Sequence, residues 1–451
     1  MSRFDEVFKN IIMGNRKPEE VYGRIFVVSA YGNVTNWLLE HKKTGEPGIY
    51  ERFAKGQDYN IHLEGLLKNL TEINQNFEKI GLDLKLANKF ISTRIIQTKN
   101  YLNSLADVLA TGYLERKNIF LAAREILASI GEAHSAFNSV NILQNNGINA
   151  KLIDLCGFND PRYLTIDERI SNAFHGIDYS KTLPIATGYT KGTEGIMREF
   201  DRGYSEVTFS KIAVEVNADE AVIHKEFHLS SADPKIVGLE KSIPVGFINY
   251  NVADQLADVG MEAIHPKASK PLEMANINIR VKNTFEPEHP GTLISKDYQD
   301  KSSGVAMITG TDKVIAIEVH DPLMVGEVGF DLGIMQIFQR HKISYILKAT
   351  NANSITQVIW EKDLNEALLT ELKGKYQKVT VMPAALVSAL GTNVDKPGVI
   401  GKATSALSDE GINIAAMSQS LMQVNIQFVI DRENYKKAII LLNDVLCYGR
   451  K

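Results

Sequence analysis

A glycine-rich loop between a short apolar strand and an amphipathic helix is the feature that most constrains the fold of this chain. The apolar run Leu183–Thr187 predicts a buried strand, and three glycines follow within residues 188–195. The segment DRGYSE, residues 201–206, then opens a helix whose apolar residues recur at helical spacing. The amide groups at a helix N-terminus favour a carboxylate or phosphate, and an arginine adds a two-pronged donor. Because Arg202 and Ser205 lie at the N-terminus of this helix, the sequence predicts an anion-binding site there.

The segment after this helix is predicted to contact a nucleotide. Residues 214–216 (VEV) have the composition of a short strand. Ala218 and Asp219 would then stand at the carboxyl end of that strand, where open α/β sheets usually hold their ligands. The pattern therefore indicates a nucleotide beside the anion site. The simpler alternative is that Asp219 only caps a turn.

Strands and helices alternate over the first two thirds of the chain. A helix is predicted at residues 2–14, and residues 24–30 form the continuous apolar run of a strand that is buried on both faces. Residues 59–140 are helical in pattern throughout, and residues 149–154 return to strand. The alternation continues to about residue 294, and this order predicts a three-layer α/β/α domain.

The bulk composition is that of a soluble globular protein and excludes several classes of function. At 451 residues the chain is too long for one ordinary core, so two or three domains are expected. Its formal net charge of −4 gives no electrostatic reason to expect a nucleic-acid or membrane partner. The two cysteines, Cys156 and Cys447, offer neither a disulfide framework nor a metal-binding spacing. Because no apolar run of membrane-spanning length and no signal-peptide pattern occurs, we expect a cytoplasmic protein.

The last third of the chain repeats one order of elements: strand, helix, strand, strand. The first copy is predicted as a strand at 314–319, a helix at 329–341 and strands at 343–349 and 354–360. The second copy is predicted as a strand at 385–390, a helix at 398–410 and strands at 412–419 and 424–430. The copies lie about 70 residues apart, which predicts an internal duplication of a ferredoxin-like βαββαβ unit. We therefore expect two small regulatory modules.

Six short motifs are spread over the first 300 residues. They are VVSAYGNVTN at 27–36, SIGE at 129–132, DRGYSE at 201–206, DPK at 233–235, IHPK at 264–267 and PGTL at 290–293. Together they resemble the aspartate kinase family, in which paired ACT domains follow an amino-acid-kinase domain. Further motifs at 395–398, 411–414 and 423–427 are similar to those of the second ACT domain. The variants GEAHSAFNSV, DRGYSE and MEAIHP are similar to those of the diverged ectoine-biosynthesis subgroup.

The resemblance implies a domain organisation. The amino-acid-kinase catalytic domain would cover residues 1–297, ACT domain 1 residues 305–376 and ACT domain 2 residues 377–451, with a last strand that could complete ACT domain 1. ACT domains of this family pair across subunits and bind amino-acid effectors at their interface, so a homodimer is implied. Residues 322–329 depart from the usual effector loop, so feedback by lysine or threonine is not implied.

The resemblance also implies the reaction, which transfers the γ-phosphoryl group of Mg-ATP to the β-carboxylate of L-aspartate. This is the first step of the aspartate-family amino-acid or ectoine pathway. The implied catalytic residues are Glu132, Arg202, Ser205 and Glu206. The implied substrate-binding residues are Thr35, Glu132, Arg202, Gly203 and Ser205, with Arg202 on the α-carboxylate and Glu132 on the α-ammonium group. The implied nucleotide-binding residues are Ser29, Ala218, Asp219, Asp233, Lys235 and Lys267, with Mg²⁺ carried by ATP and no metal site of the protein's own.

Three features of the kinase domain depart from the family pattern. Family members begin with a strand and a K-x-G-G-T-S loop that holds the transferring phosphoryl group, and this loop is absent here. Removing a preorganised charge typically slows such a reaction ~10²–10³-fold, so the chain as written is expected to turn over slowly. In addition, Tyr204 stands where the family has a glycine, and Glu206 stands where it has an aspartate.

Three alternatives remain open at this point. A start codon placed too late would explain why the loop is absent. Alternatively, the chain is a catalytically impaired regulatory relative that binds amino acids. A kinase acting on glutamate or its acetylated form is disfavoured by the paired ACT tail. For single residues the bland interpretations are a surface turn arginine at Arg202 and a helix-start charge at Glu132.

Overall fold

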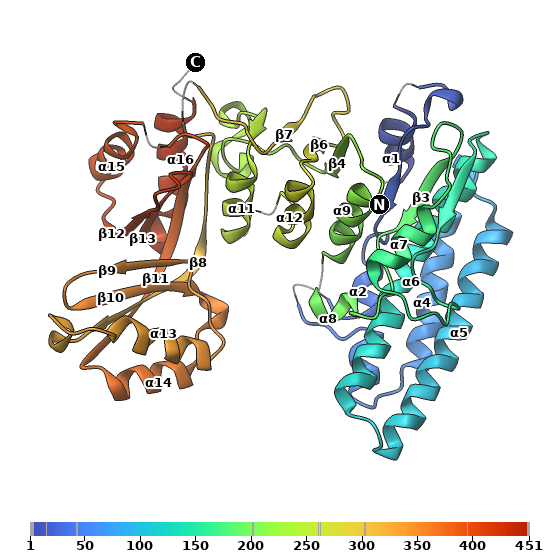
Figure 1. The fold of residues 1–451 in the computed structure, drawn as a ribbon, viewed down its shortest axis with the longest axis horizontal. Helices are drawn as coiled ribbons and strands as arrows, with labels where there is room; N and C mark the ends of the chain where they lie inside the picture. The colour runs from blue at the N-terminus through green and yellow to red at the C-terminus, as the bar shows by residue number, and fades with distance from the viewer. Residues whose placement is uncertain are drawn as a thin grey trace. The chain divides into compact units, whose positions relative to one another are not determined.

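The computed structural model describes residues 4–14, 16–41, 44–200, 203–259, 261, 263–301, 304–394 and 396–448 (Figure 1). The chain divides into two units. The first unit comprises Met1–Ala221, Lys267–Ile277 and Thr284–Glu288, and the second comprises Val222–Pro266, Asn278–Asn283 and His289–Lys451. This division falls inside the catalytic domain expected over residues 1–297. The three domain boundaries drawn from the sequence stay a prediction.

A parallel three-stranded sheet forms the centre of the first unit. Its strands are β1 (Phe26–Val28), β2 (Ala150–Ile153) and β3 (Leu183–Thr187), in the order β1-β3-β2. All five residues of β3 are buried, and Ile185 pairs with a residue of each neighbouring strand. A central strand that is covered on both faces needs a continuous apolar sequence, which β3 has.

Helices make up most of the first unit (Figure 1). They are α1 (Phe4–Val7), α2 (Val34–Leu38), α3 (Ile49–Ala54), α4 (Asn60–Gln75), α5 (Leu84–Thr111), α6 (Arg116–Asn145), α7 (Ile166–Phe174), α8 (Ile196–Glu199), α9 (Tyr204–Glu215) and α12 (Pro266–Met274), the last of which belongs to this unit from Lys267 on. Residues 128–136 of α6 are all buried, so this part of the helix is enclosed on every side. Small side chains such as Ala128, Gly131 and Ala133 let neighbouring elements approach it closely.

The second unit begins with a four-stranded sheet in the order β4-β6-β7-β5. The strands are β4 (Glu220–Lys225), β5 (Phe247–Ile248), β6 (Asn278–Asn283) and β7 (Thr292–Ile294), and the accompanying helices are α10 (Pro234–Val237) and α11 (Tyr250–Asp258). β7 pairs in parallel with β5 and in antiparallel with β6. The mixed sheet is consistent with the predicted α/β class.

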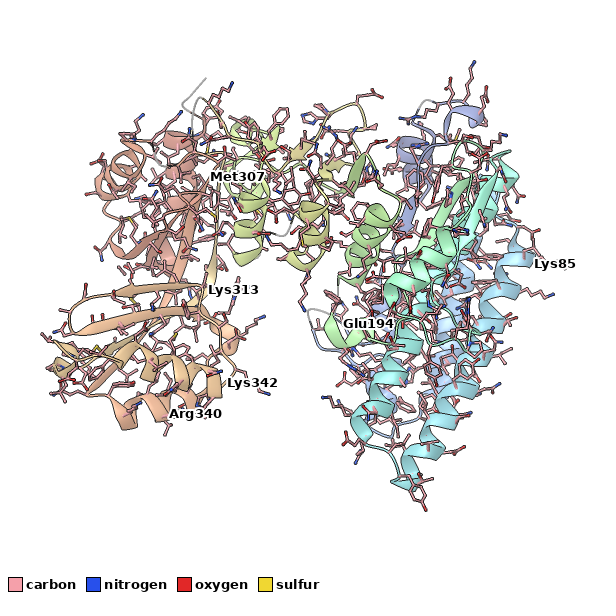
Figure 2. The ribbon with its side chains drawn as sticks, viewed as in Figure 1. Lys85, Glu194, Met307, Lys313, Arg340 and Lys342 are labelled. Carbon is pink, nitrogen blue, oxygen red and sulfur yellow. The ribbon has the colours of Figure 1, made fainter. Side chains whose placement is uncertain are left out.

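A six-stranded sheet forms the rest of the second unit. In sheet order its strands are β12 (Ile414–Gln419), β13 (Asn425–Asp431), β11 (Lys378–Leu390), β8 (Met307–His320), β10 (Ser354–Trp360) and β9 (Leu347–Thr350). The long central strands β8 and β11 run antiparallel, with a register irregularity between Ala384 and Leu386. Lys313, labelled in Figure 2, lies on β8 at this irregularity.

This sheet contains the predicted duplication. The first copy consists of β8, α13 (Phe330–Arg340), β9, β10, α14 (Glu366–Lys375) and the first half of β11. The second copy consists of the second half of β11, α15 (Val399–Asp409), β12, β13 and α16 (Tyr435–Leu446), with the first residues of β8 as its fourth strand. Each copy has its own core beneath its two helices. A further core joins strand residues of the two copies, among them Val358 and Val429.

Two expectations about local structure are corrected. The strand predicted at residues 214–216 is wrong, because Val214 and Glu215 form the last turn of α9 and Val216 is its C-cap. The single helix predicted at residues 2–14 is α1 followed by a π-helical segment, η1 (Phe8–Met13), within the described part. The strands predicted at Leu183–Thr187 and Ser354–Trp360 are confirmed at both ends. Among the described residues, no helix combines the length and the apolar character that crossing a membrane requires.

Candidate active site

Glu132 lies in the enclosed part of α6 and is only 2% exposed. The residue before it, Gly131, explains how other segments reach this point. A Cβ atom at Gly131 would lie 2.6 Å from the Ala30 Cβ and 3.2 Å from the Val34 Cγ1. Only glycine therefore lets the segment after β1 and the start of α2 lie directly against α6 beside the Glu132 carboxylate.

A second close approach brings the start of α9 to the same carboxylate. Gly203 precedes α9 with φ of 89°, a left-handed conformation that glycine adopts readily. Two residues later, the Ser205 hydroxyl donates a hydrogen bond of 3.4 Å to Glu132 Oε1. A Cβ atom at Gly188 would lie 2.6 Å from the Ser205 Oγ and 2.9 Å from the Val28 carbonyl oxygen. The ends of β1 and β3 and the N-terminus of α9 thus converge on Glu132.

Burial dominates the electrostatics of this carboxyl group. It raises the pKa of Glu132 to about 7 from the ordinary value of 4.5, because a buried carboxylate loses its hydration. Hydrogen bonds offset this rise in the pKa only in part. They come from the group's own backbone amide, the Tyr204 and Ser205 hydroxyls and the Ala30 backbone. Glu132 Oε2 is buried and makes no hydrogen bond of ordinary geometry with any described residue. An unused acceptor of this kind suits a cationic ligand group.

Ser29 and Thr35 lie on the segments that border Glu132. The Ser29 carbonyl oxygen accepts a hydrogen bond of 2.8 Å from the hydroxyl of Ser135, which lies one turn after Glu132 on α6. Its side chain is exposed. Thr35 is half-buried in the first turn of α2, next to the Val34 side chain that packs against Gly131. Glu132, Ser29, Thr35 and Ser205 are therefore gathered in one region of the first unit.

The residues expected to contact a nucleotide are spread more widely. Ala218 and Asp219 follow the C-terminal end of α9, which lies about 15 Å along the helix from Ser205. Asp233 accepts a hydrogen bond of 2.9 Å from the Lys235 backbone amide and caps α10, in the second unit. The interpretation of Ala218 and Asp219 as a strand end is corrected, since they connect a helix to β4.

The two candidate lysines each lie against an aromatic ring. The Lys235 Nζ is 5.8 Å from the centroid of Phe227, in the second unit. The Lys267 Nζ is 4.9 Å from the centroid of Phe200, in the first unit. Both lysine side chains are otherwise exposed, as a cation that meets a polyphosphate must be.

Arg202, expected to clamp the substrate's α-carboxylate, lies outside the described residues. Glu206 lies in the first turn of α9, directly after Ser205. No group of three or more histidine, cysteine, aspartate or glutamate side chains in the described ranges is arranged to hold a metal ion.

Two residues that border this region, Glu125 and Tyr189, carry no motif that would have predicted them. The Tyr189 hydroxyl donates a short hydrogen bond to Glu125 on α6, two turns before Glu132. Their separation of 64 positions leaves no local signal in the sequence. The seven-residue spacing between Glu125 and Glu132 is the one clue that both carboxylates share a helix face.

Comparison with known proteins agrees with the sequence motifs. Residues 6–283 match the amino acid kinase family, and residues 387–446 match an ACT domain. The chain is 46% identical over 452 residues to the aspartate kinase Ask_Ect of Stutzerimonas stutzeri, covering 99% of this chain and 95% of that protein. It is 25% identical to the chloroplastic aspartokinase 1 of Arabidopsis thaliana, over 92% of this chain and 73% of the relative.

Solved structures agree on the fold. The aspartate kinase of Clostridium acetobutylicum superposes with a TM-score of 0.72 at 22% identity, covering 98% of this chain and 96% of that one. E. coli aspartokinase III in complex with aspartate and ADP superposes with a TM-score of 0.68 at 20% identity, covering 94% and 93% of the two chains. The expected architecture, a three-layer α/β/α kinase domain followed by two ferredoxin-like ACT domains, is confirmed.

Proposed function

Because this chain belongs to the aspartate kinases of the amino acid kinase family, we propose that it phosphorylates the β-carboxylate of L-aspartate with ATP and releases 4-phospho-L-aspartate. The observation that carries the proposal is the hydrogen bond between the half-buried Ser205, at the N-terminus of α9, and the buried Glu132 of α6. Glu132 offers a free acceptor atom to an ammonium group, and the helix end beside it offers amide donors to a carboxylate. An α-amino acid carries both groups on one carbon atom.

The substrate would bind with its α-ammonium group on Glu132 and its α-carboxylate at the start of α9. The ammonium charge would favour the ionised form of Glu132 and lower its pKa from about 7. Gly203 and Ser205 would contribute a backbone amide and a hydroxyl to the α-carboxylate, and Arg202 would add a bidentate ion pair. Thr35 borders the same region from α2. We propose these five residues as the aspartate site.

The β-carboxylate is itself the nucleophile at neutral pH, so the chemistry depends on alignment and charge neutralisation. Ser29, exposed at the end of β1, would lie near the transferring phosphoryl group, and Glu206 would contribute from the first turn of α9. Ala218, Asp219, Asp233, Lys235 and Lys267 are the proposed nucleotide contacts. Lys235 and Lys267 each have an exposed side chain, as a lysine that contacts a phosphate group needs. Mg²⁺ would arrive bound to ATP, because this ion is usually held by substrate phosphates with few protein ligands.

Aspartyl-hydroxamate formation with Mg-ATP and aspartate tests this proposal. Ser205→Ala removes one hydroxyl from the site and is expected to lower kcat/KM for aspartate about tenfold to a hundredfold, as the loss of a hydrogen bond to a charged group does. Ser104→Ala is a matched control, because the Ser104 hydroxyl is exposed and bonds only its own helix. Equal rates for both variants and the wild type would refute the assignment of the site.

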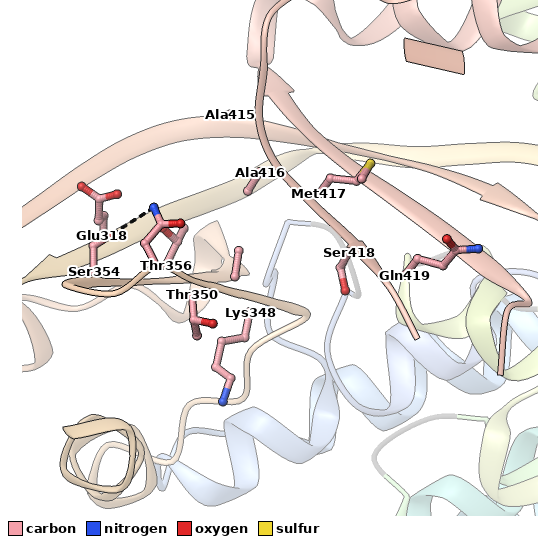
Figure 3. A pocket seen from close by; sticks show the side chains of 12 residues that line it. Glu318, Lys348, Thr350, Ser354, Thr356, Ala415, Ala416, Met417, Ser418 and Gln419 are labelled. Carbon is pink, nitrogen blue, oxygen red and sulfur yellow. Dashed lines mark hydrogen bonds between the residues drawn. The ribbon is translucent and has the colours of Figure 1, made fainter. Parts of the chain in front are cut away.

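The ACT region supports a second, regulatory function. A groove of about 490 Å³ lies between β9 and β10 on one side and β12 on the other (Figure 3). Hydroxyl and amide groups dominate its lining, including those of Thr350, Thr356 and Ser418. The Lys348 ammonium is paired with Asp331 at 2.7 Å, whereas the Glu318 carboxylate has no ion pair among the described residues. The groove therefore suits a small polar molecule with a cationic group.

We propose this groove as the effector site of the enzyme, with an amino acid as the effector class. Aspartate kinase activity would be measured with lysine or threonine added at millimolar concentration, in the wild type and in Glu318→Gln. Inhibition that Glu318→Gln weakens would support the site. The absence of any response would favour a subgroup that neither amino acid inhibits.

We also propose a homodimer formed through the ACT domains. Exposed apolar side chains cluster on two of their loops, where Leu323, Val325 and Val328 lie on one and Leu421 and Met422 on the other. Surfaces of this kind usually mark a protein interface. Sedimentation equilibrium would give twice the chain mass if the proposal holds. A monomer at micromolar concentration would contradict it.

The alternative of a catalytically impaired, amino-acid-binding regulator is not favoured. The relative with 46% identity is a named aspartate kinase and aligns over 99% of this chain. The buried Glu132 and the Ser205 hydroxyl beside it support the catalytic interpretation, because a protein that only sensed amino acids through its ACT domains would not need them.

A further inference from the structure

Two glutamates of α6 face the same side of the helix, Glu125 towards the loop between β3 and α8 and Glu132 towards the start of α9. Glu125 and Glu132 are seven residues, or two turns, apart. Glu125 Oε1 accepts a hydrogen bond of 2.7 Å from the backbone amide of Met197, and its Oε2 accepts one from the hydroxyl of Tyr189. The Glu125 carboxylate therefore binds the start of the β3–α8 loop through Tyr189 and the first turn of α8 through Met197, and so holds the loop against α6. We call this pair of contacts the fastening.

Tyr189 connects this fastening to Glu132. Its ring meets the ring of Tyr204 edge to face, with centroids 5.9 Å apart and an interplanar angle of 80°. Both tyrosines are buried, and the Tyr204 hydroxyl is one of the groups that lower the pKa of Glu132. Edge-to-face packing at this distance is favourable and fixes the orientation of both rings. The side chains form a closed path from Glu125 through Tyr189 and Tyr204 to Glu132.

The backbone on either side of Tyr189 is also fixed. The Thr187 hydroxyl donates to the Tyr189 carbonyl oxygen at 2.9 Å and accepts from the Leu155 amide at 3.0 Å. These bonds hold the Tyr189 backbone beside β3, and the direction of its ring is set by the Tyr204 ring and by the partner of its hydroxyl. That partner is Glu125.

We propose that Glu125 is a positioning residue for the amino-acid substrate, which acts through Tyr189 to hold Tyr204 against Glu132 and so sets the width of the site beside that carboxylate. The proposal rests on the proposed function, because it assigns the substrate's ammonium group to Glu132. Tyr204 has the largest side chain in the DRGYSE segment at the start of α9, so a shift of its ring changes the space beside Ser205 directly. Glu125 itself need not touch the substrate.

Three variants separate positioning from general damage. Glu125→Gln keeps both contacts, because its amide oxygen can accept from Met197 and its amide nitrogen can donate to the Tyr189 oxygen, whose hydrogen rotates. Glu125→Ala removes both contacts, and Tyr189→Phe removes one. Tyr101→Phe is the matched control, since the Tyr101 hydroxyl bonds Asn159 at 3.0 Å on the exposed surface.

The kinetic readout is the Michaelis constant of each substrate. Glu125→Ala and Tyr189→Phe are expected to raise the KM for aspartate about tenfold and to leave the KM for ATP within about twofold, because misplacement affects one site. Glu125→Gln should stay within about threefold of the wild type, and Tyr101→Phe should match it. The double variant Glu125→Ala/Tyr189→Phe should be no worse than Glu125→Ala alone, since both changes break one path. Equal rises for both substrates, or additive effects, would overturn the proposal.

Amide hydrogen exchange gives a readout that needs no activity. The Met197 amide and its neighbours should exchange faster in Glu125→Ala than in the wild type and at the wild-type rate in Glu125→Gln. Unchanged exchange in Glu125→Ala would overturn the fastening whatever the kinetics show. If the wild type phosphorylates no aspartate but exchange follows this pattern, the proposed function fails and the fastening stands. If Glu125→Ala does not fold, Tyr189→Phe and Glu125→Gln still decide between the outcomes.

Discussion

Replacing Glu132 by glutamine is expected to stabilise the protein at alkaline pH while weakening its use of aspartate. Burial raises the pKa of Glu132 to about 7 from 4.5, so the folded state binds the proton more tightly than the unfolded state does. The resulting contribution to stability is complete below pH 4.5 and is lost as the pH rises through 7. Glutamine has nearly the same shape, stays neutral at every pH and can still accept the Ser205 hydrogen bond.

The size of the effect follows from the shift in pKa. A rise from 4.5 to about 7 corresponds to about 3 kcal/mol between the two protonation states. Glu132→Gln should therefore raise the free energy of unfolding by about 3 kcal/mol at pH 8 and by less than about 1 kcal/mol at pH 5. Urea unfolding followed by circular dichroism at both pH values measures this difference. Glu51→Gln is the control, because Glu51 pairs with Lys55 on the surface and should change stability by less than about 1 kcal/mol.

The kinetic counterpart is a pH profile. With a pKa of about 7 for Glu132 in the free enzyme, kcat/KM for aspartate should fall about fivefold between pH 7 and pH 6, as the ionised fraction does. In Glu132→Gln this fall should disappear, at a level about tenfold to a hundredfold lower, because the charged partner of the ammonium group is gone. A variant less stable than the wild type at pH 8, or a flat wild-type profile between pH 6 and pH 8, would refute the reasoning.

Three further changes test the packing and burial described above. Gly131→Ala should lower the free energy of unfolding by about 1–3 kcal/mol, because its Cβ would lie 2.6 Å from that of Ala30. Gly65→Ala, in open space on α4, should be neutral or stabilise by up to about 1 kcal/mol. Urea titrations measure both variants, and equal midpoints would contradict the close approach at Gly131. Gln357→Met should stabilise the six-stranded sheet by about 1–3 kcal/mol, since both amide atoms of Gln357 are buried without a partner among the described residues, and a lower unfolding midpoint would argue against this. Burial lowers the pKa of His134 to about 3 from 6.5, so stability should fall as the pH drops below 6.5; an NMR titration of its imidazole with a midpoint near 6.5 would exclude such burial.

The strands that sequence analysis located correctly are those with one possible interpretation. Leu183–Thr187 and Ser354–Trp360 are apolar or alternating runs bounded by turn residues, and both form strands with these limits. Residues 214–216 are too few for periodicity to separate a strand from a helix end. Ile212 and Ala213 are buried against the core, whereas Val214 is 38% exposed. Val214 therefore lies on the solvent-facing side of α9, and the helix continues through it to Glu215. Tertiary packing of α9 outweighed the β preference of two valines.

The same distinction applies to the candidate site. Glu132 and Ser205 lie in two recognisable motifs, and the structure brings them within 3.4 Å of each other. Their roles, like that of Arg202, stay predictions. The contact between Glu125 and Tyr189 could not be predicted, because it depends on how a loop packs on a helix 64 positions away. Ala218 and Asp219 were misplaced for a related reason, since their position follows from where α9 ends.

The most direct test of the central claim is aspartyl-hydroxamate formation by the purified 451-residue chain with Mg-ATP, measured with aspartate and with glutamate in parallel. We predict hydroxamate formation that requires aspartate, saturates with it and is lowered by Ser205→Ala. No product above the control without amino acid, or a preference for glutamate, would contradict the assignment of an aspartate kinase site around Glu132.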